Sequence, residues 1–180
     1  MTRFAMVIDT RTCIGCGDCV VACKTENKVP EGLNRDWFVE ATSGTYPDLK
    51  TEFRSERCNH CSNPTCVTLC PTGASHLWND TNIVLVEPEK CTGCKACIAA
   101  CPYEARLVMH PDGYVDKRTF CHHRVEKGLD PACVSSCPTG CMHFGSLDDP
   151  NSKVSKLLKT RQHKVLNPET GNEPNVYYLV

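Results

Sequence analysis

The stretch that decides the fold is residues 91–102, which read CTGCKACIAACP. The spacing C-x2-C-x2-C-x3-C-P is a run that holds iron–sulfur clusters through cysteine thiolates. Structural zinc sites instead use separated C-x2-4-C knuckles, each of which supplies two ligands. Three thiols lie between positions 91 and 97, which is one too many for a knuckle. The spacing therefore favours an iron–sulfur cluster over zinc.

The composition of the whole chain agrees with a cofactor-held fold. The chain has 180 residues and sixteen cysteines, a density shared by disulfide scaffolds, zinc modules and iron–sulfur proteins. Only 7% of the residues are aromatic, which predicts a small apolar core. Residues 1–9 are typical of a first strand and not of an export signal, which argues against disulfides because these need an oxidising compartment.

Charge and hydropathy exclude two further classes. The net charge of −1 argues against a nucleic-acid partner. No run of the sequence approaches the roughly 18 apolar residues that a membrane-spanning helix needs. A compact chain organised around its cysteines is the expectation that remains.

The cysteine run recurs along the chain. Cys-Pro cores occur at residues 70–74, 101–105 and 137–141, and counting back from each gives further cysteines at similar spacing. Together with the run at residues 13–23, which has the same spacing but no proline after its last cysteine, this gives four groups: Cys13, Cys16, Cys19 and Cys23; Cys58, Cys61, Cys66 and Cys70; Cys91, Cys94, Cys97 and Cys101; and Cys121, Cys133 and Cys137. The fourth group is incomplete, because Arg118 stands where the repeat needs a cysteine. One cysteine, Cys141, stands where the other two cores have alanine.

The groups are expected to pair, because two-cluster proteins of this kind exchange the fourth ligand between paired runs. Groups two and three are adjacent in sequence, so groups one and four pair across the chain ends. The predicted ligand sets are Cys13, Cys16, Cys19 and Cys137 (set one); Cys58, Cys61, Cys66 and Cys101 (set two); Cys91, Cys94, Cys97 and Cys70 (set three); and Cys23, Cys121 and Cys133 (set four). This predicts four iron–sulfur clusters, of which three are of the [4Fe-4S] type.

Three interpretations of set four stay open. A [3Fe-4S] cluster would follow from the loss of one thiolate anchor. A [4Fe-4S] cluster would need Cys141, His122 or His123 as a replacement ligand, although Cys141 is equally typical of a small buried residue in the place of alanine. The site could also be empty. Arg118 cannot serve as a ligand because its guanidinium keeps its proton, but its charge would favour the reduced form of a neighbouring cluster.

The expected fold class is α+β, with two pseudo-symmetric ferredoxin-like halves made of short strands, short helices and long loops. Residues 1–57 together with residues 106–150 would form the half that contains groups one and four. Residues 58–105 would form an inserted half with groups two and three, and residues 151–180 a C-terminal helix and arm.

Local patterns place the elements. Short helices are predicted after the cysteine loops, at residues 19–24, 64–69 and 97–100. A later amphipathic helix is also predicted, with Val154, Leu157 and Leu158 on one face. A hairpin is predicted around residues 43–47.

The segment TFCHHRVEKG (119–128) leads to Pro-Ala-Cys at 131–133 and to CPTG at 137–140. With the four cysteine groups, this resembles the four-cluster electron-transfer subunit of DMSO-reductase-type molybdoenzymes, and polysulfide and thiosulfate reductase iron–sulfur subunits are the most similar. The resemblance implies a catalytic partner with a molybdenum or tungsten bis-pterin cofactor and an integral membrane subunit that handles quinone. It also implies a location at the membrane periphery, with export alongside a partner favoured over the cytoplasm. Arg118 departs from the family pattern.

The predicted function is the relay of single electrons between two such partners. The sequence has no P-loop, no G-x-G-x-x-G and no G-x-S-x-G, so no bond-making chemistry is expected within this chain. A free-standing polyferredoxin, or an electron-transfer module of a hydrogenase or formate dehydrogenase, is the alternative, because it would use the same clusters with another partner.

Overall fold

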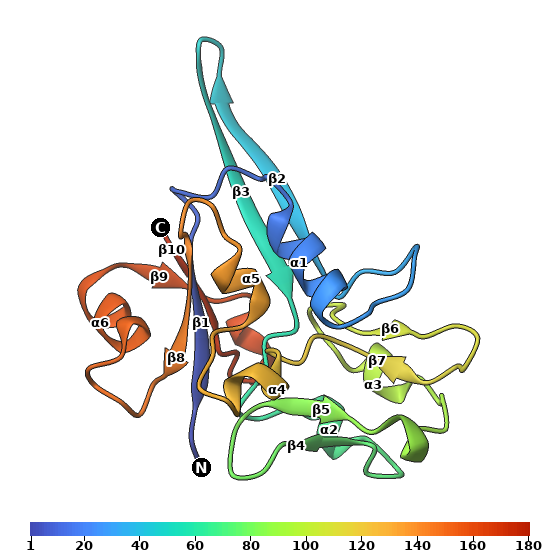
Figure 1. The fold of residues 1–180 in the computed structure, drawn as a ribbon. Helices are drawn as coiled ribbons and strands as arrows, with labels where there is room; N and C mark the ends of the chain where they lie inside the picture. Colours follow the sequence, from blue (N-terminus) through green and yellow to red (C-terminus); the bar gives the residue numbers. More distant parts are fainter.

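A four-stranded sheet joins the two ends of the chain in the computed structural model, which describes residues 1–180 (Figure 1). The strand order is β8 (Met142–Ser146), β1 (Phe4–Asp9), β10 (Val176–Leu179) and β9 (His163–Lys164). Strand β1 is parallel to β10 and antiparallel to β8. The end of the predicted C-terminal arm, residues 176–179, is thus a central strand of this sheet.

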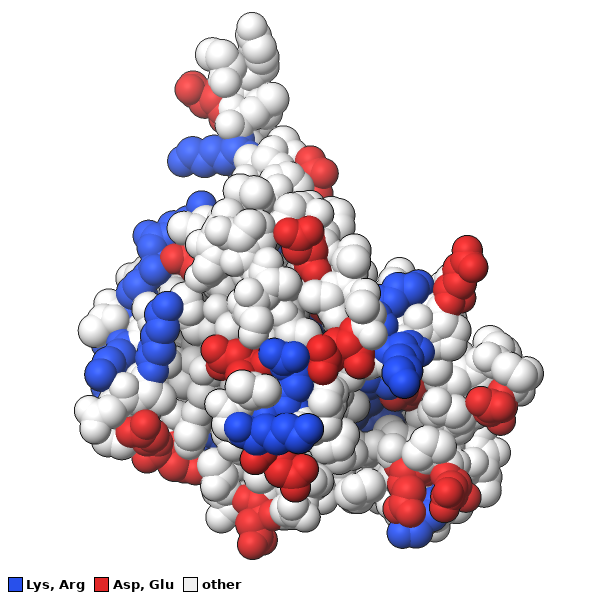
Figure 2. Space-filling model, in the orientation of Figure 1, with Lys and Arg blue, Asp and Glu red and all other residues white.

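The predicted amphipathic helix is confirmed as α6 (Lys153–Thr160), which covers one face of this sheet. It begins at Ser152, whose Oγ accepts a hydrogen bond from the N–H of Ser155 at 3.1 Å. Val154 is fully buried with residues of β1 and β10. Lys and Arg side chains gather over α6 and β9 at the left of Figure 2, while both signs of charge mix elsewhere on this face.

Three hairpins complete the strands. The longest consists of β2 (Asp36–Thr45) and β3 (Asp48–Arg57), and its tip projects well out of the body (Figure 1). The predicted hairpin around residues 43–47 is therefore confirmed, with longer strands than the sequence pattern indicated. The other two are β4 (Ser75–Leu77) with β5 (Val84–Val86), and β6 (Leu107–Val108) with β7 (Val115–Asp116).

The remaining helices are short and lie within the cysteine groups. They are α1 (Asp18–Glu26), α2 (Thr65–Thr68), α3 (Ala96–Ala99), α4 (His122–Val125) and α5 (Ala132–Ser135), with 3₁₀ turns at Pro88–Lys90 and Pro168–Thr170. Helices α1, α2 and α3 confirm the three helices predicted after the cysteine loops. No helix has the length and apolar character that crossing a membrane requires.

The apolar core is small and includes thiols. Its main cluster has ten buried residues, and three of them are Cys19, Cys133 and Cys141. The core therefore lies directly against the cysteine groups, so that any group bound there is part of the packing.

Candidate functional site

The cysteine loops turn sharply because residues with positive φ stand between the thiols. Gly93 has φ +67°, and a Cβ added there would lie 2.7 Å from the carbonyl oxygen of Gly113. Glycine is the residue that adopts this conformation without a steric penalty. Lys95, which precedes α3, also has positive φ at 62°. The loop thereby wraps tightly enough for thiols three residues apart to face one point.

Sets one, two and three each surround a cavity, and each cavity contains all four predicted thiols. Cavity one is lined by Cys13, Cys16, Cys19 and Cys137; cavity two by Cys58, Cys61, Cys66 and Cys101; cavity three by Cys70, Cys91, Cys94 and Cys97. Their volumes, adjoining open space included, are about 360, 330 and 320 Å³. The three cavities are therefore alike in size and in having four thiols in their lining.

Hydrogen bonds from the chain support the thiolate form of several of these cysteines. The Sγ of Cys70 accepts the N–H of Ser75 at 3.3 Å, and the Sγ of Cys91 accepts the N–H of Val115 at 3.4 Å. Burial acts to raise the pKa of Cys70, but the hydrogen bonds from Ser75 and Thr72 outweigh it and hold that pKa below its usual value. Because the thiolate is the form that binds metal, these donors prepare the site for iron.

Two thiols of set two have a raised pKa instead. Burial raises the pKa of Cys61 to about 12, and it also raises the pKa of Cys101. Such thiols ionise when a metal takes the place of the proton, so cluster assembly releases protons. The donor set therefore fits a cluster that contributes to the stability of the folded chain.

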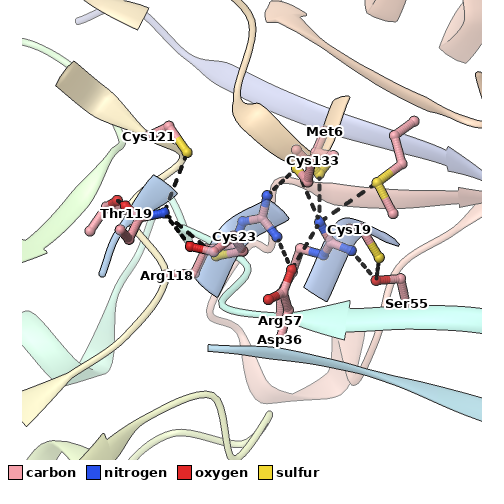
Figure 3. Close-up of polar contacts among 12 residues, drawn as sticks. Met6, Cys19, Cys23, Asp36, Ser55, Arg57, Arg118, Thr119, Cys121 and Cys133 are labelled. Atoms are coloured by element: carbon pink, nitrogen blue, oxygen red, sulfur yellow. Dashed lines mark hydrogen bonds and ion pairs between the residues drawn. The ribbon is translucent and has the colours of Figure 1, made fainter. Parts of the chain in front are cut away.

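Set four differs from the other sets because a buried guanidinium, that of Arg118, contacts the thiol of Cys133 and lies within range of the charges of Cys23 and Cys121 (Figure 3). Arg118 Nη1 lies 2.6 Å from Asp36 Oδ2, and Nη2 donates to the Sγ of Cys133. Burial acts to lower the pKa of Arg118, but the charges of Cys133 and Asp36 hold it well above its ordinary value. A permanent cation thus stands where the repeat would place a fourth thiol.

A second buried guanidinium lies beside the first. Arg57 Nη1 is 3.8 Å from Asp36 Oδ2 and 3.8 Å from the Sγ of Cys133, and it also contacts the Sδ of Met6 at 3.3 Å (Figure 3). The Nε atoms of Arg57 and Arg118 are buried without a hydrogen-bond partner. Two buried cations with only one carboxylate leave an excess of positive charge. This excess fits a site that also contains a negatively charged group.

The other two thiols of set four share one donor. Asn27 Nδ2 is 3.7 Å from the Sγ of Cys23 and 3.7 Å from the Sγ of Cys121. Burial raises the pKa of Cys23 to about 12, against the opposing charge of Arg118. Set four therefore has the hydrogen-bond support of a cluster site but only three thiols.

The three residues considered as replacement ligands of set four each have other neighbours in the structure. Cys141 immediately precedes β8 and lines cavity one, where its Sγ is 3.4 Å from the Sγ of Cys137. Cys141 is therefore a fifth thiol beside set one, where its burial agrees with the interpretation of a small buried residue in the place of alanine. His123 Nε2 lies 2.8 Å from a carboxylate oxygen of Glu26, and the ring of His122 packs edge-on against Trp78.

Asp36→Asn is expected to destabilise the chain by about 3–5 kcal/mol, because it leaves two buried guanidinium groups without their carboxylate. Denaturant unfolding under anaerobic conditions measures this loss. Asp48→Asn at the exposed tip of the β2–β3 hairpin is the matched control and should change the free energy of unfolding little. Equal stability of the two variants would show that Asp36 does not compensate the cations.

The four sets follow one another through the molecule. Ser55 Oγ contacts the Sγ of Cys19 in set one at 3.4 Å and also accepts a hydrogen bond from Arg57. Arg57 in turn contacts the Sγ of Cys133 in set four. Arg57 directly precedes Cys58 of set two. Arg106 lines both cavity two and cavity three. These shared neighbours link set one to set four, set four to set two, and set two to set three, which is consistent with the order one, four, two, three.

Sequence reasoning missed the buried charges of this site. Asp36, Arg57, Arg106 and Lys117 are at most 7% exposed. A lysine or arginine in a polar segment is normally a surface residue, so no pattern in the sequence distinguishes these positions. The only sequence feature that could have indicated burial is that Arg106 and Lys117 lie close in sequence to cysteine groups.

Comparisons with known proteins agree with this arrangement. Two models described as 4Fe-4S dicluster domain match the chain, one over residues 49–147 and one over residues 12–74. Two dicluster domains with sixteen cysteines indicate four iron–sulfur clusters in an α+β, ferredoxin-like fold.

Curated relatives match nearly the whole chain. A tetrathionate reductase subunit of Salmonella typhimurium is 42% identical, over 98% of this chain and 72% of that protein. The arsenate respiratory reductase iron–sulfur subunit ArrB of Shewanella sp. is 35% identical, over 98% of this chain and 96% of that protein. Protein NrfC of Escherichia coli is 42% identical, over 97% of this chain and 79% of that protein. The chain therefore belongs to the electron-transferring iron–sulfur subunits of the DMSO-reductase family of molybdoenzymes.

Proposed function

We propose that this chain relays single electrons between a catalytic subunit with a molybdenum or tungsten bis-pterin cofactor and a membrane subunit that handles quinone. The observation that carries the proposal is the order of the cysteine sets. They follow one another through the molecule, and the exposed cysteines, Cys16 and Cys94, belong to the first and last sets of that order. A row of sites that reaches the surface at both ends suits entry of electrons at one end and exit at the other.

Iron–sulfur clusters supply one-electron exchange at potentials that the surrounding protein adjusts. The chain's own residues bind the clusters through the thiols of the four sets and donate hydrogen bonds to their sulfur atoms. The apolar walls of the cavities exclude water, and the buried cations offset negative charge. No residue of the chain is assigned to bond-making chemistry.

We infer that the cluster of set four is of the [3Fe-4S] type. Three thiols can anchor three irons, and the cation of Arg118 stands at the fourth corner. Asp36 holds that cation in place, so the corner does not open to iron. An oxidised protein with a three-iron EPR signal is the expected result. Iron sufficient only for sets one to three would mean that Arg118, Asp36 and Arg57 fill the site instead of a cluster.

Metal analysis of anaerobically purified protein tests the cofactor. Iron and acid-labile sulfide in nearly equal amounts are expected, with the absorption of cysteine-bound clusters. Zinc in place of iron would contradict the proposal, as would cysteines paired in disulfides.

Purification of the intact complex tests the partners. A large subunit that contains molybdopterin is expected to co-purify with this chain, together with an integral membrane subunit. A monodisperse monomer that exchanges electrons freely with soluble donors would favour the free-standing polyferredoxin instead.

The proposal extends to location, substrate and domains. We infer peripheral attachment to the membrane through the anchor subunit, on the exported side, and a catalytic partner similar to the polysulfide and thiosulfate reductases. Support comes from family membership and from the relative that is part of a tetrathionate reductase. Residues 1–57 with 106–150, residues 58–105 and residues 151–180 are proposed as the three parts of the chain. Cell fractionation with and without the anchor subunit tests the location.

A further inference from the structure

Arg106 stands between two cluster cavities. It follows α3 and directly precedes β6, and its side chain lines both cavity two and cavity three. The residue is 7% exposed. Its Nη2 donates to the Oγ of Ser75 at 2.8 Å, whereas its Nη1 is buried with no hydrogen-bond partner. An unused donor on a buried guanidinium indicates that a further acceptor belongs beside it.

The charge of Arg106 is not balanced by any carboxylate. Every ion pair of the chain involves other residues, so no acidic oxygen lies within 4.0 Å of this guanidinium. Leaving a buried charge uncompensated costs several kcal/mol. Burial acts to lower the pKa of Arg106, but the charges of Cys66, Cys58 and Cys97 outweigh it and raise that pKa. These thiols belong to set two and set three, so a negatively charged group in either cavity would lie beside this guanidinium.

We propose that Arg106 is a positioning residue shared by the clusters of sets two and three, whose fixed charge raises the reduction potential of both. The inference deepens the electron relay proposed above and rests on it. Adding an electron makes a cluster more negative, and a nearby cation stabilises the reduced form. The effect is strong in a buried site, where the low dielectric screens charge weakly. A guanidinium suits the role because it does not lose its proton.

A charge between two clusters acts on both at once. It raises both potentials in the same direction, so it changes the free energy of electron transfer between the two clusters less than a charge beside only one of them would. The unused Nη1 donor supplies a hydrogen bond to sulfur, which is a second way in which a neighbouring residue raises a potential. Sets one and four are not in contact with this guanidinium.

The test is an EPR-monitored redox titration of the anaerobically purified protein, with the signals assigned by loss of set two in Cys101→Ser. In Arg106→Gln, the ratio of reduced to oxidised cluster at a fixed potential should fall about tenfold for both sets two and three. For a one-electron couple this is a shift of about 59 mV to lower potential. The potential of set one and the iron content should not change.

Two variants serve as controls. Arg106→Lys keeps the charge but not the planar fork, so its ammonium reaches one cavity better than the other and the two potentials should separate. Lys95→Gln removes a positive charge that is exposed and lines cavity three alone, so set two should keep its potential.

The proposal is overturned if Arg106→Gln shifts only one of the two potentials, shifts neither, or shifts set one by the same amount. If Arg106→Gln does not retain its clusters, Arg106→Lys decides: a fall of about tenfold in the ratio of reduced to oxidised cluster for both sets, although the charge is kept, would overturn the proposal. Failure of this inference can be told apart from failure of the proposed relay. A chain that does not co-purify with a molybdopterin subunit would contradict the relay but would still show these shifts in potential.

Discussion

Cys101→Ser is expected to remove the cluster of set two and to leave the cluster of set three intact. In sequence, Cys101 closes the run at residues 91–102, whose other cysteines belong to set three. In space, it lines the cavity of Cys58, Cys61 and Cys66. Serine cannot supply the soft thiolate that iron–sulfur clusters need. The iron content should fall by the amount of one cluster, and the EPR signals of set three should persist.

Cys70→Ser is the reciprocal variant. Cys70 lies in the second cysteine group but lines cavity three, so its loss should remove the cluster of set three and leave set two. Cys141→Ala is the matched control, because Cys141 is a fifth thiol at cavity one and not a member of any quartet. It should retain all clusters. If each serine variant instead lost the cluster of its own sequence run, the exchange of ligands between runs would be wrong.

The loss of a cluster should also weaken the fold. Cys58 and Cys61 form a buried group with Tyr103 and Ala105, so the packing there depends on a filled cavity. Cluster binding contributes folding free energy because the sites do not exist in the unfolded chain. Cys101→Ser is therefore expected to unfold at lower denaturant concentration than Cys141→Ala.

The sequence predicted the parts of the site that depend on spacing. Three thiols of one run must face one point because the loop between them is short, and the run at residues 91–102 shows this directly. The helices after the loops and the strand at the N-terminus follow from local patterns as well. The structure places the thiols of sets one to three around three separate cavities.

Other features depend on packing between distant segments. The pairing of β1 with β10 joins Met6 to Val176, and no local pattern specifies such a partner. Asp36 reaches Arg118 from a hairpin far away in sequence. Cys141 has the sequence features of a spare ligand, but β8 follows it at once and holds it at cavity one. These contacts follow from the fold and not from any spacing.

Arg118→Cys is expected to convert set four into an ordinary [4Fe-4S] site. A thiol at position 118 would complete the C-x2-C spacing with Cys121 and give Cys23 and Cys133 a fourth partner. The variant also removes the buried guanidinium that now lies against the thiol of Cys133 (Figure 3). Asp36 keeps Arg57 as a neighbour, with 3.8 Å between the charged atoms, so its carboxylate is not left alone.

The expected result is a gain of iron relative to the wild-type protein and a new [4Fe-4S] signal in the low-temperature EPR spectrum of the reduced protein. Arg118→Ala is the control, because it removes the same cation without adding a ligand and should gain no four-iron signal. The two variants differ only in the sulfur atom of the side chain, which is the atom that would bind iron. If Arg118→Cys leaves both the spectrum and the iron content unchanged, another residue already completes the wild-type site, and the three-thiol description of set four is wrong.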